Sequence, residues 1–184
     1  QDLIALARAK PGALNFASAG IGTPPHLAGE LFNSMAGVKM VHIAYKGGGP
    51  ALTDLLAGQV GIYFSGISSV LPFVKDGKLR GIAVTSAKRT AIMPDTPTVS
   101  ESGLPGYEVG NWYAIVAPAA TPKVIIMRLN AEILKALAGP DLRKRFFDLA
   151  ADPLGSTPEE LLKYNRSELD KWAKVIKSAG IQPE

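Results

Sequence analysis

A short loop rich in glycine and hydroxyl side chains is the segment of this sequence best suited to bind a ligand. It runs Ser18-Ala19-Gly20-Ile21-Gly22-Thr23, between an expected strand and an expected helix. Peptide N–H groups near a helix N-terminus form a site for anions, and glycine lets a backbone approach a ligand closely. Ser18 and Thr23 add hydroxyl groups, while His26 could bond back to the loop or lie in the core. These residues predict an anion site, with a plain tight turn as the alternative.

Two prolines limit what the helix end can contribute. Pro24 and Pro25 have no N–H group, so an anion would depend on the N–H groups of residues 19–23. Pro25 also stands at the third glycine position of a dinucleotide-binding loop, and no acidic residue ends the next strand, which excludes that class of site. Residues 47–49 are glycines, but no Gly-Lys-Ser/Thr follows them, so they do not form a phosphate-binding P-loop.

Catalysis and metal binding have little support. The only histidines are His26 and His42, and no Gly-x-Ser-x-Gly motif is present. A hydrolase with Ser18 as nucleophile would need a base that a carboxylate orients. Two histidines without an HExxH motif or a cysteine argue against a zinc site. We therefore expect no catalytic residue, no metal site and no cofactor.

A second polar loop, which contains Ser65 and Gly66, follows the third expected strand. The carboxyl ends of neighbouring parallel strands meet at one edge of a sheet, so this loop would lie beside the Ser18 loop. The alternative is that its hydroxyl groups cap the next helix. Farther along, Trp112 and Tyr113 are expected to lie in the core.

Strand-like and helix-like segments alternate over roughly the first 110 residues, which indicates βαβ units and a mostly parallel sheet flanked by helices. Strands are expected at residues 14–17, 40–45, 60–64, 79–84 and 112–116, and helices at 2–10, 24–36, 50–58, 68–75, 122–137, 140–149 and 157–178. The strand at 79–84 is aliphatic enough to be buried on both faces. The final helices have no strands of their own, so they must pack on the first sheet or on strands upstream of Gln1.

Composition narrows the class of protein. The chain has 184 residues, 47% of them hydrophobic and 20% charged, which is typical of a globular protein. The net charge of +4 is mild, and no basic and aromatic stripe suggests nucleic acid. No apolar stretch is long enough to span a bilayer. The chain contains no signal peptide and begins in a helix-like pattern, so we expect a fragment.

A series of motifs along the chain resembles the Bug-type receptors of tripartite tricarboxylate transporters. The motifs lie at residues 3–7, 11–12, 18–28, 45–51, 54–60, 77–80, 83–86, 94–99, 103–108, 117–118 and 121–122. The resemblance implies an α/β fold like that of type II periplasmic binding proteins, whose two lobes close around a carboxylate. Residues 1–112 would form the second ligand-binding lobe. Residues 113–184 would supply a crossover strand and helices to the C-terminal part of the other, incomplete lobe.

The function that this resemblance implies is capture of a small carboxylate in the periplasm for membrane transporter subunits. The ligand would contact residues 18–23, His26, Ser65 and Gly66. The alternative is a sensory or interaction module of the same fold without a transport role. The family usually has Asp where Gly61 stands and often Asp-Asn at positions 65–66, so we expect a plain carboxylate rather than an amino acid. Without further strands to pack on, the helices after residue 120 would expose an apolar face, so we expect either self-association through that face or a rearranged packing of the tail.

Overall fold

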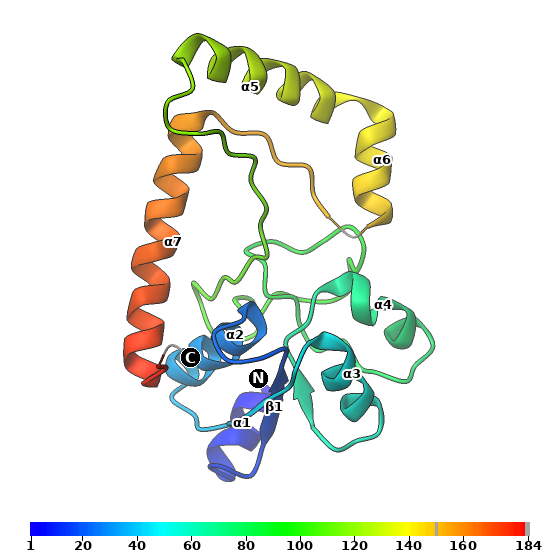
Figure 1. Cartoon of the computed structure of the whole chain (residues 1–184). Helices are drawn as coiled ribbons and strands as arrows, with labels where there is room; N and C mark the ends of the chain where they lie inside the picture. The colour runs from blue at the N-terminus through cyan, green and yellow to red at the C-terminus, as the bar shows by residue number, and fades with distance from the viewer. Residues whose placement is uncertain (150, 183–184) are drawn as a thin grey trace. The chain divides into compact units, whose positions relative to one another are not determined.

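The chain folds into two compact units. The computed structural model describes residues 1–149 and 151–182 (Figure 1). Unit 1 consists of Gln1–Asn111 together with the segment that begins at Trp172, and unit 2 is Trp112–Lys171. The expected division into two lobes, residues 1–112 and 113–184, stays a prediction, and the units differ from it in that the segment from Trp172 belongs to unit 1. Residues 150, 183 and 184 of the second part lie outside the described residues.

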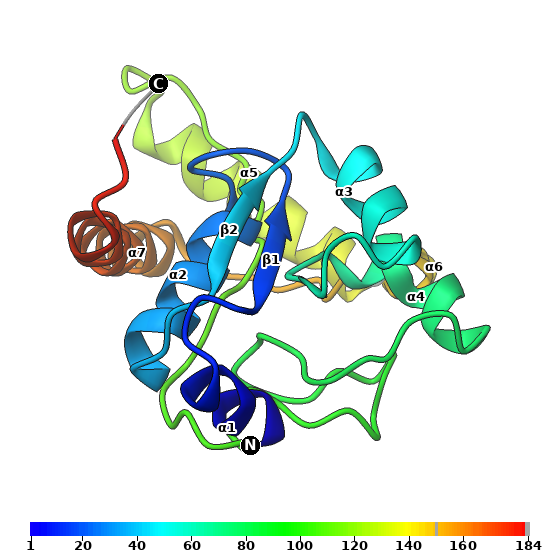
Figure 2. The ribbon, with the colours of Figure 1, turned by 90° about the horizontal axis from the view of Figure 1, so that it is seen from below.

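Three parallel strands form the sheet of unit 1. They are β1 (Asn15–Ser18), β2 (Val41–Ala44) and β3 (Ile62–Tyr63), in the order β2-β1-β3. Figure 2 shows β1 and β2 side by side. The expected strands at 14–17, 40–45 and 60–64 are confirmed, and the parallel arrangement with them. Because β1 is central, the loop that follows it lies between the ends of both neighbouring strands.

Four helices surround this sheet. They are α1 (Asp2–Ala9), α2 (Pro24–Ala36), α3 (Gly48–Leu56) and α4 (Ile67–Lys75). Successive side chains of a strand point to opposite faces. Accordingly, Phe16 is buried in a cluster with Ala28 and Phe32 of α2, and Ala17 is buried in a second cluster with Ala51 of α3.

Two glycines shape helix α2. A Cβ atom at Gly29 would lie 2.1 Å from the ring of Phe16, so only glycine lets the helix pack this closely on β1. Gly37 ends the helix in the left-handed conformation, with φ 61°, as a C-terminal glycine typically does. The helix expected at residues 24–36 is confirmed, whereas the sequence does not predict the contact between Gly29 and Phe16.

The expected strand at residues 79–84 is wrong. Only Val84 forms a bridge, parallel to Thr98, and Ile82 is exposed rather than buried on two faces. The backbone of Val84 bonds with Pro97 and Val99 instead of extending the sheet. A proline in the partner segment removes a donor, which prevents a longer ladder from forming.

Unit 2 is helical. It contains α5 (Lys123–Ala138), α6 (Pro140–Asp148) and most of α7 (Pro158–Ala179), close to the three expected helices. Thr157 and Glu160 accept each other's backbone N–H groups, at 3.1 and 2.8 Å, in a capping box that starts α7.

The crossover strand expected at 112–116 is absent from the described residues. Tyr113 is 89% exposed, and Ile115 and Val116 are also exposed, because no neighbouring strand pairs with this segment. Trp112 makes an edge-to-face contact with Tyr164 but is itself partly exposed, so the expectation that Trp112 and Tyr113 lie in a core is wrong.

Candidate functional site

The loop at residues 18–23 joins the end of β1 to the start of α2. Its backbone requires two glycines, because Gly20 has φ 139° and Gly22 has φ 73°, values that side chains disfavour. The carbonyl groups of Ser18 and Ala19 accept hydrogen bonds from the N–H groups of Tyr45 and Gly47, at 3.1 and 3.0 Å. These bonds fasten the loop to the chain that follows β2.

Ser18 points inward. It is 0% exposed, and its Oγ accepts the N–H of Gly20 at 3.1 Å. The same oxygen lies 2.6 Å from Nε2 of His42 on β2 and 3.0 Å from the carbonyl oxygen of Gly20. The hydroxyl group therefore organises the loop from within the fold.

Thr23 occupies the N-cap position of α2 but makes no side-chain cap. Its Oγ1 instead donates to the carbonyl oxygen of Gly20 at 2.6 Å. A threonine cap accepts the N–H of the second or third helical residue; Pro25, the second, has none to donate, and the N–H of His26, the third, does not bond to Thr23. The hydroxyl group of Thr23 closes the turn instead of capping the helix.

His26 both bonds back to the loop and lies in the core. It is 5% exposed, and its Nδ1 accepts the N–H of Gly22 at 3.0 Å. Its ring stacks on that of His42, with centroids 3.8 Å apart and planes 13° apart. A direct contact between His26 and a ligand stays a prediction, since the geometry places the side chain against the loop's own backbone.

The N–H groups of the loop divide into two sets. Those of Gly20, Gly22 and Thr23 bond to groups inside the protein. Within the described residues, those of Ala19 and Ile21 donate to no acceptor. The donors available to a ligand are therefore these two amides, fewer than the five N–H groups that the sequence suggests for residues 19–23.

The Ala19 N–H has a defined direction. The peptide between Ser18 and Ala19 is trans, so its C=O and N–H point in opposite directions. Its carbonyl bonds to Tyr45 beyond β2, and the N–H therefore points towards the side of β1 on which β3 lies. The Ser65 loop follows β3 on that side.

The Ser65 loop begins at the carboxyl end of β3, next to β1, where the sequence placed it. The hydroxyl group of Ser65 donates to the carbonyl oxygen of Gly66 at 3.3 Å. Gly66 is the N-cap of α4, which has no side-chain cap, so the alternative in which a hydroxyl group caps this helix does not hold. Whether Ser65 and Gly66 contact a ligand stays a prediction.

The loop itself carries no positive charge, whereas Lys46 lies between Tyr45 and Gly47, the two residues whose N–H groups bond to the loop. No lysine or arginine occurs between positions 11 and 38. Burial lowers the pKa of His26, and burial together with repulsion from His26 lowers the pKa of His42 to about 4. Both imidazoles are therefore neutral at neutral pH. An anion at this loop would depend on the unused peptide N–H groups, because the hydroxyl groups of Ser18 and Thr23 are already bonded inside the loop.

His42 is the site residue that the sequence analysis missed. The sequence suggests for it only the roles of base or metal ligand, whereas in the structure it reaches Ser18 from the neighbouring strand. The register pairs Phe16 with His42 and Ser18 with Ala44, which places Phe16, Ser18 and His42 on one face of the sheet. Strand alternation in the sequence could have revealed this shared face, but only if the register had been known.

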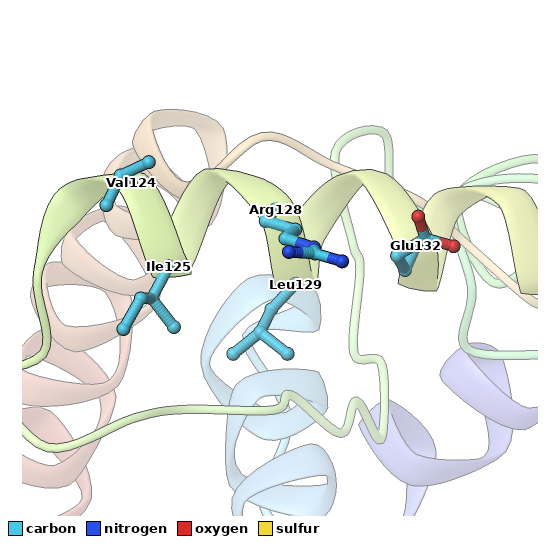
Figure 3. Close-up of a pocket in the computed structure, with 5 residues that line it drawn as sticks. All are labelled: Val124, Ile125, Arg128, Leu129 and Glu132. Atoms are coloured by element: carbon cyan, nitrogen blue, oxygen red, sulfur yellow. The ribbon is translucent and has the colours of Figure 1, made fainter.

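A surface hollow in unit 2 is a poor candidate for a ligand site. It is lined by five residues that all belong to helix α5, namely Val124, Ile125, Arg128, Leu129 and Glu132 (Figure 3). A pocket normally takes its walls from several elements. No group of three potential metal ligands occurs in the part of the chain that the structure describes. Over the same residues, no helix combines the length and apolarity of a membrane span.

Comparison with a curated relative supports a common family. A protein encoded in the tcbD-tcbE intergenic region of a Pseudomonas species is 41% identical over 176 residues, which cover 95% of this chain and 52% of the relative. The chain thus spans about half the length of the curated relatives it matches, such as BugT of Bordetella pertussis, of which it covers 55%.

Solved structures have the same fold. R. palustris Rpa4515 with adipate matches at a TM-score of 0.83 and 35% identity, over 100% of this chain and 61% of that one. The periplasmic binding protein BugD matches at 0.77 and 34%, over 100% and 62%. MatC from Rhodopseudomonas palustris with bound malate matches at 0.73 and 32%, over 95% and 60%. The fold of this chain is that of the periplasmic binding proteins.

The family model for the tripartite tricarboxylate transporter family receptor, TctC, matches residues 1–181. This match covers nearly the whole chain and both of its units. The resemblance to Bug-type receptors is therefore confirmed, and the chain belongs to the TctC family of tripartite tricarboxylate transporter receptors.

Proposed function

We propose that this chain carries the carboxylate-binding loop of a periplasmic solute receptor that delivers its ligand to the membrane subunits of a tripartite transporter. The observation that carries the proposal is the pair of unused N–H groups of Ala19 and Ile21, at the carboxyl end of the central strand. Ligands of open α/β sheets bind at this edge. These two peptide donors, on either side of the N–H of Gly20 that bonds to Ser18, suit the two oxygens of a carboxylate.

The relatives support this choice of ligand. Two solved structures of the same fold contain adipate and malate, which are both dicarboxylates. A site that relies on backbone N–H groups recognises the carboxylate and leaves the rest of the ligand to other residues. We propose that Ser65 and Gly66, at the same edge of the sheet, contribute to that second part.

We further propose that the ligand lacks an amino group. Ser65-Gly66 stands where the family often has Asp-Asn, so the carboxylate that would pair with an ammonium group is missing. The other departure, Gly61, precedes β3 and so lies at the opposite end of that strand. Ser65 and Gly66 are therefore the residues whose identity matters for selectivity. Aspartate or glutamate as the tightest ligand would refute this preference.

Release and uptake would follow from closure of two lobes. A ligand that contacts both lobes stabilises the closed state by the difference in its contacts between the two states. A sensory or interaction module of the same fold would use the same loop, and would differ in showing no binding to the transporter's membrane subunits.

A hydrolase is the second candidate, because Ser18 Oγ and His42 Nε2 are only 2.6 Å apart. Three observations favour binding. Ser18 is fully buried, its oxygen already accepts the N–H of Gly20, and a pKa of about 4 makes His42 a weak base. The relatives are also receptors. We propose that the chain is not an enzyme.

Calorimetric titration of this chain with adipate, malate, acetate and glutamate tests the proposal. We expect binding of the dicarboxylates, and a loss of about fivefold to tenfold in affinity for Ser18→Ala, which removes one hydrogen bond from the loop. The matched control is Ser34→Ala, an exposed serine of α2, which should bind as the wild type does. Turnover of an ester that Ser18→Ala abolishes would favour the hydrolase, and equal affinities of all variants would contradict the role of the loop.

We also propose that the chain self-associates through the exposed apolar side chains of unit 2, among them Val124, Leu129 and Leu154. Light scattering over a range of concentrations should show a mass that rises above 19.4 kDa. Leu129→Glu should shift the distribution towards the monomer. A concentration-independent monomer would refute the proposal.

A further inference from the structure

We propose that His26 and His42 are positioning residues for the loop, which hold the N–H groups of Gly20 and Gly22 inward so that those of Ala19 and Ile21 face the ligand. The consequence for ligand affinity rests on the function proposed above. The consequence for the loop itself does not, because it concerns hydrogen bonds within the protein.

The two rings act on different parts of the loop. They stack with centroids 3.8 Å apart, and Phe16 stacks on His42 at 5.1 Å. From this stack, Nδ1 of His26 accepts the N–H of Gly22 at 3.0 Å, and Nε2 of His42 contacts Ser18 Oγ at 2.6 Å. Ser18 Oγ in turn accepts the N–H of Gly20.

The result is an alternation along the loop. The N–H groups of Gly20 and Gly22 point to Ser18 and His26, and those of Ala19 and Ile21 have no acceptor among the described residues. Both inward bonds end on groups that belong to or touch the histidine stack. Loss of either bond would free the peptide it holds to rotate, and the adjacent outward N–H would lose its fixed direction.

Proton positions follow from these contacts. Since Nδ1 of His26 accepts a hydrogen bond, the neutral ring must carry its proton on Nε2. The hydroxyl group of Ser18 can donate only one hydrogen bond. If Nε2 of His42 is unprotonated, the hydroxyl group donates to it; if Nε2 carries the proton, the hydroxyl group donates to the carbonyl oxygen of Gly20. With either tautomer, the N–H of Gly20 still donates to Ser18 Oγ, and the carbonyl oxygen of Gly20 still accepts the hydrogen bond from Thr23 Oγ1.

The surroundings keep the stack uncharged. Burial lowers the pKa of both histidines. The charged group that faces them from α2 is Glu30, whose Oε1 lies 3.9 Å from Nε2 of His26, too far for a hydrogen bond. Strand β1 contributes only uncharged side chains, and β2 has no other titratable residue. A proton on Nδ1 of His26 would face the N–H of Gly22 and break that bond.

Asparagine and glutamine separate the two nitrogen positions. The side-chain amide of Asn reaches about as far as Nδ1 of His, and that of Gln about as far as Nε2. His26→Asn and His42→Gln therefore preserve the contact that each histidine makes with the loop, and His26→Gln and His42→Asn remove it. All four variants lose the imidazole stack, so an effect of ring packing alone would not distinguish Asn from Gln at either position.

The first measurement needs no ligand. Amide hydrogen exchange by NMR should show Gly22 at least tenfold faster in His26→Gln than in His26→Asn, and Gly20 at least tenfold faster in His42→Asn than in His42→Gln. Amides of β1 serve as the internal reference, because a variant that is globally destabilised accelerates these as well. Titration with adipate should show losses of about fivefold to tenfold in the mismatched variants only.

The outcomes separate this inference from the proposed function. If exchange follows the pattern but adipate binds neither to the wild type nor to any variant, the positioning role stands and the carboxylate function fails. If the wild type binds adipate and the Asn and Gln variants behave alike at each position in both measurements, the function stands and the positioning role is refuted. Unprotected Gly20 and Gly22 amides in the wild type would refute the positioning role by themselves.

Discussion

In unit 1, α1 and α2 bury Ala7, Ala28 and Phe32 against β1, whereas in unit 2 helix α5 leaves Val124 and Leu129 in solvent. Helices α2 and α5 are both amphipathic, with apolar residues at helical spacing. Among the described residues, the buried apolar core consists of unit 1 residues alone. An amphipathic pattern thus provides a surface for packing, and only a partner element turns that surface into a core.

Helix α7 shows the same contrast within one element. Its segment in unit 1 contains the buried Val175 and the partly buried Trp172, and Trp172 packs against the hydrophobic cluster that contains Phe16. Its segment in unit 2 exposes Leu162 and Leu169. The difference also explains where a precise site can exist, because the loop at residues 18–23 needs β1, β2 and α2 to be held in fixed register. The comparison predicts that equal substitutions in the two units have unequal effects.

The largest effect should come from a pair of phenylalanines. Phe16→Ala empties a fully buried site in unit 1 and should lower the free energy of unfolding by about 3–5 kcal/mol. Phe147→Ala in unit 2 removes a ring that is 53% exposed and should cost less than about 1 kcal/mol. Urea denaturation followed by fluorescence and circular dichroism measures both. Equal losses would show that unit 2 has a core comparable with that of unit 1.

A pair of glycines should give the next largest effect. Gly29→Ala places a methyl group 2.1 Å from the ring of Phe16 in a packed core, which should cost about 1–3 kcal/mol. Gly155→Ala meets the end of Leu134 at 2.4 Å, but that side chain is flexible and has room to move, so the cost should stay below about 1 kcal/mol. The same denaturation experiment applies. A larger loss at Gly155 than at Gly29 would reverse the comparison.

Acid should act mainly on unit 1, which contains both histidines. Burial lowers the pKa of His42 from 6.5 to about 4, so the unfolded chain binds more protons than the native chain between these values. The stabilisation is complete above about pH 6.5 and is lost as the pH falls towards 4. Because His42 is only partly buried, we expect a change of roughly 1–2 kcal/mol.

The control for this prediction is His42→Gln, whose unfolding free energy should depend less on pH over that range. Burial raises the pKa of Glu30, which acts in the opposite direction but equally in both proteins, so the difference between them isolates His42. Fluorescence of Trp172 in a Trp112→Phe background reports on unit 1. An identical pH dependence of the two proteins would contradict the pKa shift of His42.

Much of the fold could be predicted because it depends on local chemistry. The strand-like segments at 14–17 and 40–45 located β1 and β2, and the helices expected at 24–36 and 157–178 match α2 and α7 to within one residue. The motif series pointed to the family before any contact was known. Errors arose at residues 79–84 and 112–116, where strand-like composition lacked a strand to pair with. Pairing is a long-range property, and a segment's own residues do not contain it.

For the candidate site, the sequence by itself determined which loop could bind an anion, through Gly20 and Gly22, and which donors Pro24 and Pro25 remove. Only the tertiary structure decided which amides remain available, because that depends on Ser18 and on His42, which lies 24 positions farther along the chain. Parallel register brings these two side chains to one face of the sheet, and the stack with His26 directs the loop between them. The chemical groups are encoded locally, and their directions come from packing.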